Sequence, residues 1–170
     1  MEINGISVLP NVIEDLSKEL KERLTIIENK IYELAGETFN IGSPKQLGDI
    51  LYEKIGLPKG KGKNATSTAH DVLIKYKDRF PIINEILEYR NLSKLVSTYL
   101  DTFNSYILED GKIHTIYTQT LTRTGRLSSI EPNLQNIPVR TEYGKMVRRA
   151  FIPEENSKLL SSDYSQIELR

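Results

Sequence analysis

One carboxylate, Asp163, lies in the stretch LLSSDYSQIELR at residues 159–170, directly after a short apolar run. Leu159 and Leu160 are typical of a buried β-strand, so we expect Asp163 at the end of a strand, followed by a turn into a helix. A carboxylate oxygen in such a place can bind a divalent cation such as Mg²⁺. A lone aspartate caps a helix more often than it binds a metal, and the residue types alone leave both interpretations open.

A second candidate region is the stretch TRTGRLSSIEPNLQNIPVR at residues 122–140, which is poor in apolar residues. Arginine and amide side chains can reach sugar, phosphate and minor-groove base acceptors of a nucleic acid. The stretch therefore favours a contact with nucleic acid that depends on geometry more than on base sequence, and an ordinary polar loop is the alternative. Its hydrogen-bonding groups are Arg123, Arg126, Ser128, Ser129, Asn133, Gln135, Asn136 and Arg140.

The third candidate is the lysine-rich loop Lys59-Gly60-Lys61-Gly62-Lys63. It is not a phosphate-binding P-loop, because no register supplies a glycine, four residues and then Gly-Lys-Ser or Gly-Lys-Thr. The glycines would let the main chain approach a phosphate backbone, and the lysines would act as point charges. Two interpretations remain open: a mobile solvated loop, or a basic tip that touches phosphates.

The charge distribution supports a polyanionic partner, although the formal net charge is zero. Basic side chains are in excess in residues 41–79 and 111–150, and acidic side chains are in excess in the other segments. Such alternation is expected if two separate surfaces meet a polyanion, or if the charges are ordinary solvated ones. The sequence therefore keeps a nucleic-acid partner open without requiring it.

Composition excludes several classes of protein. The 170 residues include no cysteine and two histidines, which excludes disulfides and thiolate metal sites and disfavours a histidine-rich metal site. No apolar run approaches the roughly 20 residues of a membrane span, and the first residues do not resemble a secretion signal. We expect a soluble, monomeric, cytoplasmic protein without membrane contact.

The elements that must position these residues are mainly helical in the first 110 residues. Apolar residues at spacings of three and four predict a long helix between Pro10 and Gly36 and another from Pro81 to Ile107, which we expect to pack as an antiparallel pair. Between them, Ser43-Pro44-Lys45-Gln46 predicts a capping box and a short helix, and a third helix is expected to start near Ser67. The turn Glu109-Asp110-Gly111 then precedes a strand that includes Ile113, Thr115 and Tyr117, so the expected fold class is α+β.

Three blocks of residues resemble, in order, landmarks of the family A DNA polymerases of the bacterial DNA polymerase I type. They are Thr124-Gly125-Arg126-Leu127-Ser128-Ser129, then Pro132-Asn133-Leu134-Gln135-Asn136-Ile137-Pro138, then Asp163-Tyr164-Ser165-Gln166-Ile167-Glu168-Leu169-Arg170. The resemblance also takes in MEINGI, SPKQL, ATST and LEYRNLSKLVSTYLD, so it covers nearly the whole chain. In that family MEINGI lies inside a longer polypeptide, so we expect Met1 to be a fragment boundary.

The resemblance implies a division into two subdomains. Residues 1–110 look like the polymerase thumb, a long antiparallel helical hairpin with short helices at its tip that grips duplex DNA. Residues 1–9 are then a short segment next to the palm, and residues 111–170 look like a partial antiparallel β palm. The basic loop falls at the thumb tip, so Lys61, Lys63 and Ser67 become candidate DNA contacts.

The resemblance also implies roles for individual residues. Asp163 matches one of two catalytic aspartates that bind Mg²⁺ in a two-metal site, and the main-chain carbonyl of Tyr164 matches a further ligand. Glu168 matches the residue that excludes a 2′-hydroxyl and so selects deoxynucleoside triphosphates. Arg126 matches an arginine that reaches the minor groove at the primer end. Further matches are Gln166 and Arg140 near the incoming nucleotide, Asn133, Gln135 and Asn136 beside primer and template, and Arg90 and Lys94 near the DNA backbone.

From this resemblance we expect a fragment of a DNA-directed DNA polymerase that binds primer–template DNA and acts in replication and repair. The fingers lysine and tyrosine and the second catalytic aspartate of the family are absent from these 170 residues, so only half of the two-metal site is expected here. We therefore expect the isolated chain to be unable to polymerise. The alternative is a freestanding helical DNA-binding or protein-interaction module in which Asp163 is only structural.

Overall fold

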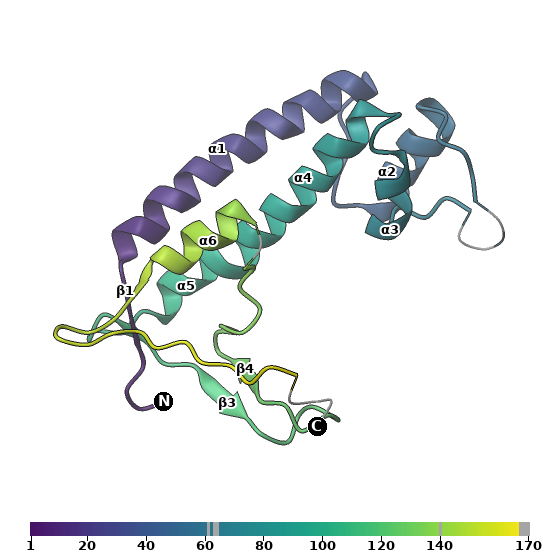
Figure 1. Cartoon of the computed structure of the whole chain (residues 1–170). Coiled ribbons are helices and arrows are strands. Elements are labelled where there is room, and N and C mark those ends of the chain that lie inside the picture. The colour runs from purple at the N-terminus through teal and green to yellow at the C-terminus, as the bar shows by residue number, and fades with distance from the viewer. Residues whose placement is uncertain (61, 63–64, 140, 167–170) are drawn as a thin grey trace. The chain divides into compact units, whose positions relative to one another are not determined.

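The computed structural model describes residues 1–60, 62, 65–139 and 141–166 of the chain (Figure 1). Contacts between residues divide the chain into two compact units: Ser17–Tyr99 is one, and Met1–Leu16 together with Leu100–Arg170 is the other. Helices and small antiparallel sheets are both present, so the predicted α+β class is confirmed. Within the described ranges, no helix combines the length and apolar character that a membrane span requires.

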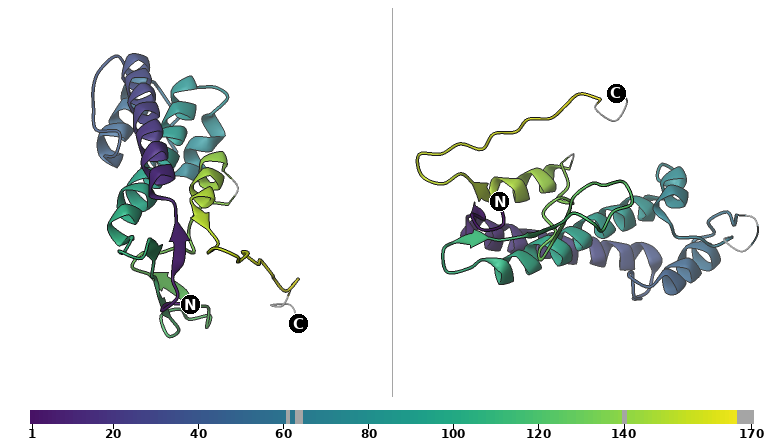
Figure 2. Two further views of the ribbon diagram at one scale, coloured as in Figure 1. Left: turned by 90° about the vertical axis from the view of Figure 1, so that its left-hand side faces the viewer. Right: turned by 90° about the horizontal axis from the view of Figure 1, so that it is seen from below.

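Two long helices dominate the unit Ser17–Tyr99. Helix α1 (Pro10–Ala35) and helix α4 (Pro81–Leu95) lie side by side in Figures 1 and 2. The helices are antiparallel, as predicted, because partners that advance along α1 recede along α4. Two ion pairs show this order, with N–O distances of 2.9 Å for Arg23 with Glu88 and 2.5 Å for Lys30 with Glu85.

The apolar stripe predicted for α1 is buried over most of its length. Leu20, Ile27 and Ile31 are at most 2% exposed, because spacings of three and four place them on one face of the helix. Leu34, the last residue of the predicted stripe, is 40% exposed. The last buried residue of the helix is instead Ala35, at 3% exposed, so the stripe predicts the helix correctly but places the end of its buried face on the wrong residue.

The second predicted helix is present as α2 (Pro44–Gly48), followed directly by a π-helical segment, η1 (Asp49–Lys54). Ser43 caps it as expected, since its Oγ accepts a hydrogen bond from the Gln46 N–H at 3.4 Å. The predicted capping box is wrong in its other half. The Gln46 side chain accepts from the Asn40 N–H at 2.8 Å, because the Ser43 N–H already donates to the Asn40 carbonyl.

The third helix begins later than predicted. It consists of α3 (His70–Leu73) and a 3₁₀ turn, η3 (Ile74–Tyr76), so it starts three residues after Ser67. The Tyr52 hydroxyl donates to the Ser67 carbonyl at 2.7 Å, and the Arg90 guanidinium donates to the Thr68 carbonyl. These contacts hold both carbonyls outside the helical hydrogen-bond pattern, so the helix starts beyond them.

The fourth predicted helix, Pro81–Ile107, is a helical run in three parts. Helix α4 passes into a π-helical segment, η4 (Val96–Leu100), and then into α5 (Asp101–Tyr106). Its predicted apolar face continues through all three parts, since Ile86, Leu100 and Phe103 are fully buried. Ile107 is the residue after the last turn, with extended backbone angles.

A three-stranded antiparallel sheet forms the core of the other unit. Strand β1 (Ile6–Val8) lies between β2 (Lys112–Ile113) and β5 (Phe151–Ile152), with Ile6 opposite Ile113 and Val8 opposite Phe151. Helix α5 packs near β2, and α6 (Glu142–Arg149), a helix that the sequence analysis did not anticipate, packs near β5. The rings of Phe103 and Phe151 meet edge to face with centroids 5.6 Å apart.

The single strand expected to include Ile113, Thr115 and Tyr117 is wrong. Ile113 ends β2, whereas Tyr117 belongs to β3 (Ile116–Thr118), which pairs with β4 (Ser128–Ile130) in a separate hairpin. The break falls at His114 and Thr115. Their side chains bond to the main chain of residues 2, 130 and 132, and so draw the backbone out of a continuous ladder.

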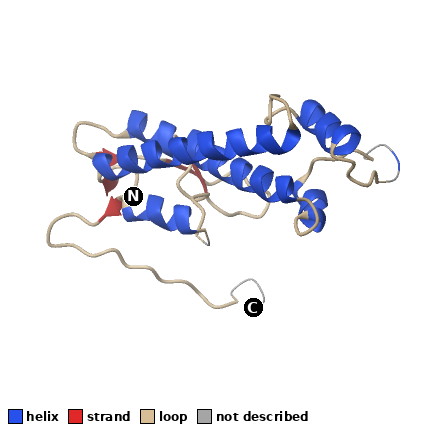
Figure 3. Cartoon of the chain, turned by 90° about the horizontal axis from the view of Figure 1, so that it is seen from above, coloured by secondary structure: helices blue, strands red, loops and turns tan. Residues whose placement is uncertain are grey.

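The strand expected before Asp163 is also wrong. After β5 the described chain runs as an extended loop without strand pairing through residue 166 (Figure 3). Leu159 is 61% exposed and Leu160 is 92% exposed, so neither has the burial expected of a strand in a sheet core. A strand needs a neighbour for its N–H and C=O groups, and no described segment pairs with this one. The helix expected after Asp163 falls mainly on residues 167–170, which lie outside the described residues.

Candidate nucleic-acid interface

Arg126 lies in the loop that connects β3 and β4. The strands pair Ile116 with Ile130 and Thr118 with Ser128, which leaves residues 119–127 as the connection. Gly125 has φ of +73°, a conformation that glycine adopts without the steric cost of a side chain. The Thr122 hydroxyl donates to the Arg126 carbonyl at 2.6 Å and closes the turn, with the Arg126 side chain exposed to solvent. The turn therefore presents a guanidinium at the end of the hairpin.

The loop that carries Asn133, Gln135 and Asn136 follows β4 directly. The Asn133 Oδ1 accepts hydrogen bonds from the N–H groups of Gln135 at 3.1 Å and Asn136 at 3.2 Å. This cap orders the turn, and the side chains of Gln135 and Asn136 remain exposed. Asn133 is half-buried, so its oxygen serves the loop itself, whereas the other two amides face solvent.

Helix α6 supports the far end of this loop. Thr141 caps the helix by accepting from the Gly144 N–H at 3.1 Å, and Arg148 in the last turn donates to the Ile137 carbonyl at 3.2 Å. Gly144 faces the Pro138 carbonyl so closely that a Cβ atom would lie 2.3 Å from its oxygen. The loop therefore contacts α6 at two consecutive backbone carbonyls.

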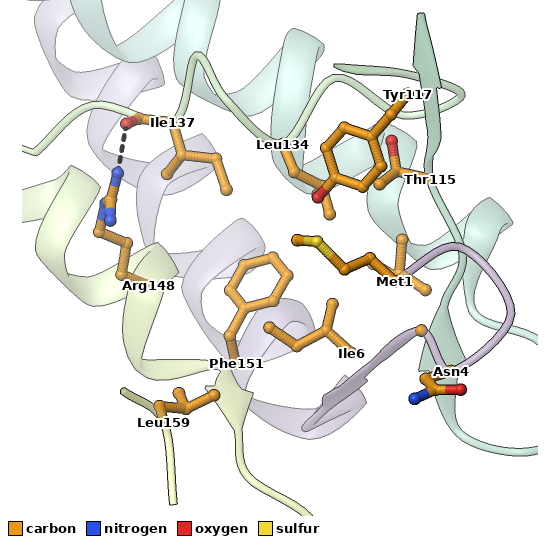
Figure 4. A pocket seen from close by; sticks show the side chains of 12 residues that line it. Met1, Asn4, Ile6, Thr115, Tyr117, Leu134, Ile137, Arg148, Phe151 and Leu159 are labelled. Carbon is orange, nitrogen blue, oxygen red and sulfur yellow. Dashed lines mark hydrogen bonds between the residues drawn. The ribbon is translucent and has the colours of Figure 1, made fainter. Parts of the chain in front are cut away.

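A cavity of about 660 Å³ lies beneath this loop and beside the three-stranded sheet (Figure 4). Apolar side chains, among them Ile6, Leu134 and Phe151, make most of its lining, and Thr115 and Arg148 contribute polar groups. Figure 4 shows Arg148 bonded to Ile137 at one side, with Thr115, Tyr117 and Leu134 at the other. The cavity therefore lies between the Arg148 contact at Ile137 and the part of the same loop that contains Leu134.

The candidate residues of the unit Ser17–Tyr99 differ in their surroundings. Lys94 is exposed in the last turn of α4, and Ser67 is half-buried, with its Oγ accepting from the Ala69 N–H at 3.3 Å. Arg90 is half-buried, because its guanidinium donates to the carbonyl of Thr68 and, at 3.3 Å, to the Thr68 Oγ1. Burial lowers the pKa of Arg90 from its usual value. Lys61 and Lys63 lie outside the described residues.

The candidate metal ligands lie in the extended loop after β5. Asp163 and Tyr164 are exposed, the latter by 79%, and Gln166 has φ of +55°. Carboxylate and carbonyl oxygens are donors that Mg²⁺ prefers, so these residues fit the ion in kind. Among the described residues, however, no group of three or more His, Cys, Asp or Glu side chains is gathered to hold a metal ion. Glu168 and Arg140 lie outside the described residues.

Sequence reasoning missed the buried hydroxyl groups of this region. Thr115 is 5% exposed and Ser129 is fully buried, with their oxygens 2.6 Å apart. Ser129 was one of the groups expected to be available to a partner, whereas its side chain lies inside the protein. No sequence signal marks Ser129 as buried, because the three-residue strand that turns its side chain inward is visible only in the structure.

Comparison with known proteins gives matches over almost the whole chain. The family model for DNA polymerase family A matches residues 10–170. DNA polymerase I of Lactococcus lactis subsp. cremoris is 57% identical over 171 residues, and DNA polymerase I of Geobacillus stearothermophilus is 50% identical over 173 residues. Each alignment covers 100% of this chain and 20% of the relative. The chain therefore spans about a fifth of the length of these curated relatives.

A solved structure is similar in fold as well as in sequence. It is the polymerase domain of Pol1 from M. smegmatis, in complex with DNA primer–template and dNTP. The TM-score is 0.84 and the identity 38%, and the match covers 91% of this chain and 28% of that chain. The similarity in fold thus extends over most of this chain.

Proposed function

Because the chain belongs to DNA polymerase family A, we propose that it binds primer–template DNA and contributes residues to template-directed deoxynucleotidyl transfer by a DNA-directed DNA polymerase. The observation that carries the proposal is the family match over residues 10–170, which contains all three sequence motifs. Replication and repair are the processes that such an activity serves. We also propose that the protein is monomeric and cytoplasmic; the absence of cysteine from the sequence is in keeping with the cytoplasm.

The proposed thumb comprises residues 1–110, with residues 1–9 next to the palm, and the proposed partial palm comprises residues 111–170. Support for the thumb comes from the antiparallel pair α1 and α4 and from the short helices α2 and α3, which follow α1 and precede α4 in the chain. In this proposal Lys94, Lys61, Lys63 and Ser67 approach the DNA backbone. Arg90 would approach the DNA backbone too, although its guanidinium already donates a hydrogen bond to Thr68.

The proposed minor-groove contacts come from the loops on either side of β4. Arg126 has a guanidinium with five N–H donors, and minor grooves offer purine N3 and pyrimidine O2 as acceptors. Gln135 and Asn136 are exposed amides on a capped turn, so they can donate to the same kind of acceptor. Acceptors of this kind occur on all base pairs, which suits an enzyme that must bind any sequence.

At the proposed catalytic end, the Asp163 carboxylate and the Tyr164 carbonyl would hold Mg²⁺. When bound, the ion would neutralise phosphate charge on the nucleotide. Gln166 and Arg140 are proposed to contact the deoxynucleoside triphosphate, and Glu168 to exclude a 2′-hydroxyl. The described residues supply only part of a coordination shell, so the remaining ligands of the proposed two-metal site have to come from other residues.

A chimera tests this proposal directly. Residues 1–170 replace the matching segment of the Lactococcus lactis DNA polymerase I, with which they share 57% identity. We expect the chimera to extend a primer, and we expect Asp163→Ala to abolish incorporation while primer–template affinity is retained. Asp78→Ala removes an exposed carboxylate elsewhere and serves as the matched control.

The outcomes separate the alternatives. Near-normal incorporation by the Asp163→Ala chimera would show that the metal role is wrong. A folded chimera that binds primer–template but does not extend it would favour a binding module without catalysis. A folded chimera that does not bind DNA would contradict the whole proposal.

A further inference from the structure

Two buried hydroxyl groups connect the β3–β4 hairpin to the loop that carries Asn133. Thr115 precedes β3, and Ser129 is the central residue of β4. Their side chains are 5% and 0% exposed, and the distance between Thr115 Oγ1 and Ser129 Oγ is 2.6 Å. Neither hydroxyl can therefore contact DNA, so any effect on DNA binding has to act through other residues.

The proton count of this pair gives a consistent chain of hydrogen bonds. The Leu134 N–H donates to Ser129 Oγ at 3.1 Å, and either hydroxyl can donate to the other. In one arrangement Ser129 donates to Thr115. Thr115 can then donate its own proton to the Pro132 carbonyl at 2.8 Å, with the Ile130 carbonyl at 2.9 Å as the neighbouring acceptor. In the other arrangement Thr115 donates to Ser129, and Ser129 donates to the same Pro132 carbonyl at 3.2 Å, so both arrangements run from the Leu134 N–H to the Pro132 carbonyl.

Both ends of this chain of hydrogen bonds are backbone atoms of the two residues that flank Asn133. The Pro132 carbonyl is immediately before it and the Leu134 N–H immediately after it, so the hydroxyl pair fixes the backbone on both sides of that residue. The Asn133 Oδ1 in turn accepts from the N–H groups of Gln135 and Asn136. The position of the two exposed amides therefore depends on atoms that solvent does not reach.

We propose that Thr115 and Ser129 are positioning residues that hold the Asn133 turn in the geometry needed to bind duplex DNA. This inference rests on the proposed function, because it assumes that Gln135 and Asn136 contact the primer–template. A held turn binds with less loss of conformational entropy than a mobile one, so the hydroxyl pair would raise affinity without touching the ligand. Since neither residue is charged, it would do so without changing the salt dependence of binding.

The test uses the 170-residue chain with Thr115→Val, which replaces the hydroxyl by a methyl group of similar size, and Thr115→Ser, which keeps the hydroxyl. Thr118→Val is the matched control, because the Thr118 hydroxyl donates to Ser128 within the hairpin. A fourth variant carries Gln135→Ala and Asn136→Ala together. The measurements are the affinity for a labelled primer–template at two salt concentrations and hydrogen exchange at the Leu134 N–H.

We expect Thr115→Val to weaken binding about fivefold or more, which corresponds to about 1 kcal/mol, with an unchanged salt slope, because the variant removes the buried hydrogen bonds of the Thr115 hydroxyl and each such bond contributes about that much. Exchange at the Leu134 N–H should become faster, while amides of the α5 and α6 helices keep their protection. Thr115→Ser should restore both values, and Thr118→Val should leave both close to those of the original chain.

Two results would contradict the positioning role, and a third would contradict the proposed function of the loop. Unchanged Leu134 exchange and unchanged affinity in Thr115→Val would overturn the positioning role. An equal loss of affinity in Thr118→Val would also overturn it, since general weakening of the hairpin would then explain the effect. If the Gln135 and Asn136 variant binds normally while Leu134 still responds to Thr115→Val, the turn is held but does not contact DNA, and the proposed function of this loop fails instead.

Discussion

At the scale of single residues, His114 joins the N-terminal segment to the turn before β2. Its Nδ1 lies 2.7 Å from the Glu2 carbonyl, and its Nε2 lies 3.0 Å from Oδ2 of Asp110. Both partners only accept hydrogen bonds, so the ring can donate to both only as the imidazolium. The Asp110 carboxylate, followed by the Glu2 carbonyl, raises the pKa of His114, against smaller opposing effects of desolvation and then of the Lys112 charge.

This geometry predicts that the contribution of His114 to stability depends on pH. A group whose pKa is raised in the folded state contributes fully below its unfolded pKa, and the contribution is lost as pH rises through the folded pKa. We expect the free energy of unfolding of the original chain to exceed that of His114→Gln most at about pH 5 and least at about pH 9. Urea denaturation of both chains across this range measures the difference. A difference that grows with rising pH would contradict the assignment.

Glu168 carries a second prediction at the residue scale, in the chimeric polymerase. If its side chain occupies the space of a 2′-hydroxyl, Glu168→Ala should lower the discrimination against ribonucleotides by about tenfold or more, because the site no longer rejects the extra group. Single-nucleotide incorporation with deoxyribonucleotides and ribonucleotides measures this ratio. Glu155→Ala, an exposed glutamate in the extended loop, is the matched control. Unchanged discrimination in Glu168→Ala would remove this role.

At the scale of elements, the contact between α6 and the preceding loop depends on Gly144. A Cβ at this position would lie 2.3 Å from the Pro138 oxygen and 2.8 Å from the Pro138 carbonyl carbon, so Gly144→Ala has to displace backbone. We expect it to lower the free energy of unfolding by about 1–3 kcal/mol, as overpacking does. Gly48→Ala is the control, because its Cβ would meet the Thr66 carbonyl oxygen at an ordinary 3.5 Å. Equal denaturation midpoints for the two variants would contradict this account.

The elements also show why the sequence predicted some parts of the structure and not others. Helices α1 and α4 follow from local spacing, because a stripe of apolar residues defines a helix by itself. The strands are two or three residues long, and β1 pairs with β2 and β5, which are far away in the chain. The alternation at residues 113–117 therefore indicated strand structure without showing that it is divided between β2 and β3. The expected strand at Leu159 and Leu160 failed for the same reason, because an apolar pair does not indicate what will pair with it.

The candidate site shows the same difference between residues that the sequence could predict and residues that it could not. Arg126 and Gln135 could be predicted as DNA contacts because they belong to ordered motifs of recognisable residue types, and the structure places both in exposed loops. Thr115 and Ser129 could not, because their role depends on a contact between residues 14 positions apart and on burial. Arg90 is expected from the resemblance to lie near the DNA backbone, whereas its guanidinium donates to Thr68. A buried role for a charged residue is visible only once its partners are placed.

At the scale of the whole chain, a net charge of zero conceals two regions with a basic excess, residues 41–79 and 111–150. The first belongs to the unit Ser17–Tyr99, and the second to the other unit. Acidic excess elsewhere keeps the net charge low without cancelling local attraction, because charges farther apart than about 8–10 Å in physiological salt are largely screened from one another. Neutrality therefore does not argue against a polyanionic ligand.

We predict that the 170-residue chain binds duplex or primer–template DNA with little sequence preference and marked salt dependence. Cations that neutralise phosphates release bound counterions, and about three such contacts correspond to a slope of about −2.7 in log affinity against log salt, or about a 40-fold loss for a fourfold rise in salt. Fluorescence anisotropy with two labelled duplexes of unrelated sequence at several salt concentrations measures both properties.

Lys94→Gln should weaken binding to both duplexes alike and reduce the slope by about one, because it removes one phosphate contact. Lys30→Gln is the matched control, since Lys30 already pairs with Glu85 across the helices at 2.5 Å. Binding that does not change with salt, or an equal effect of the two lysine variants, would show that phosphate contacts do not hold this chain to DNA.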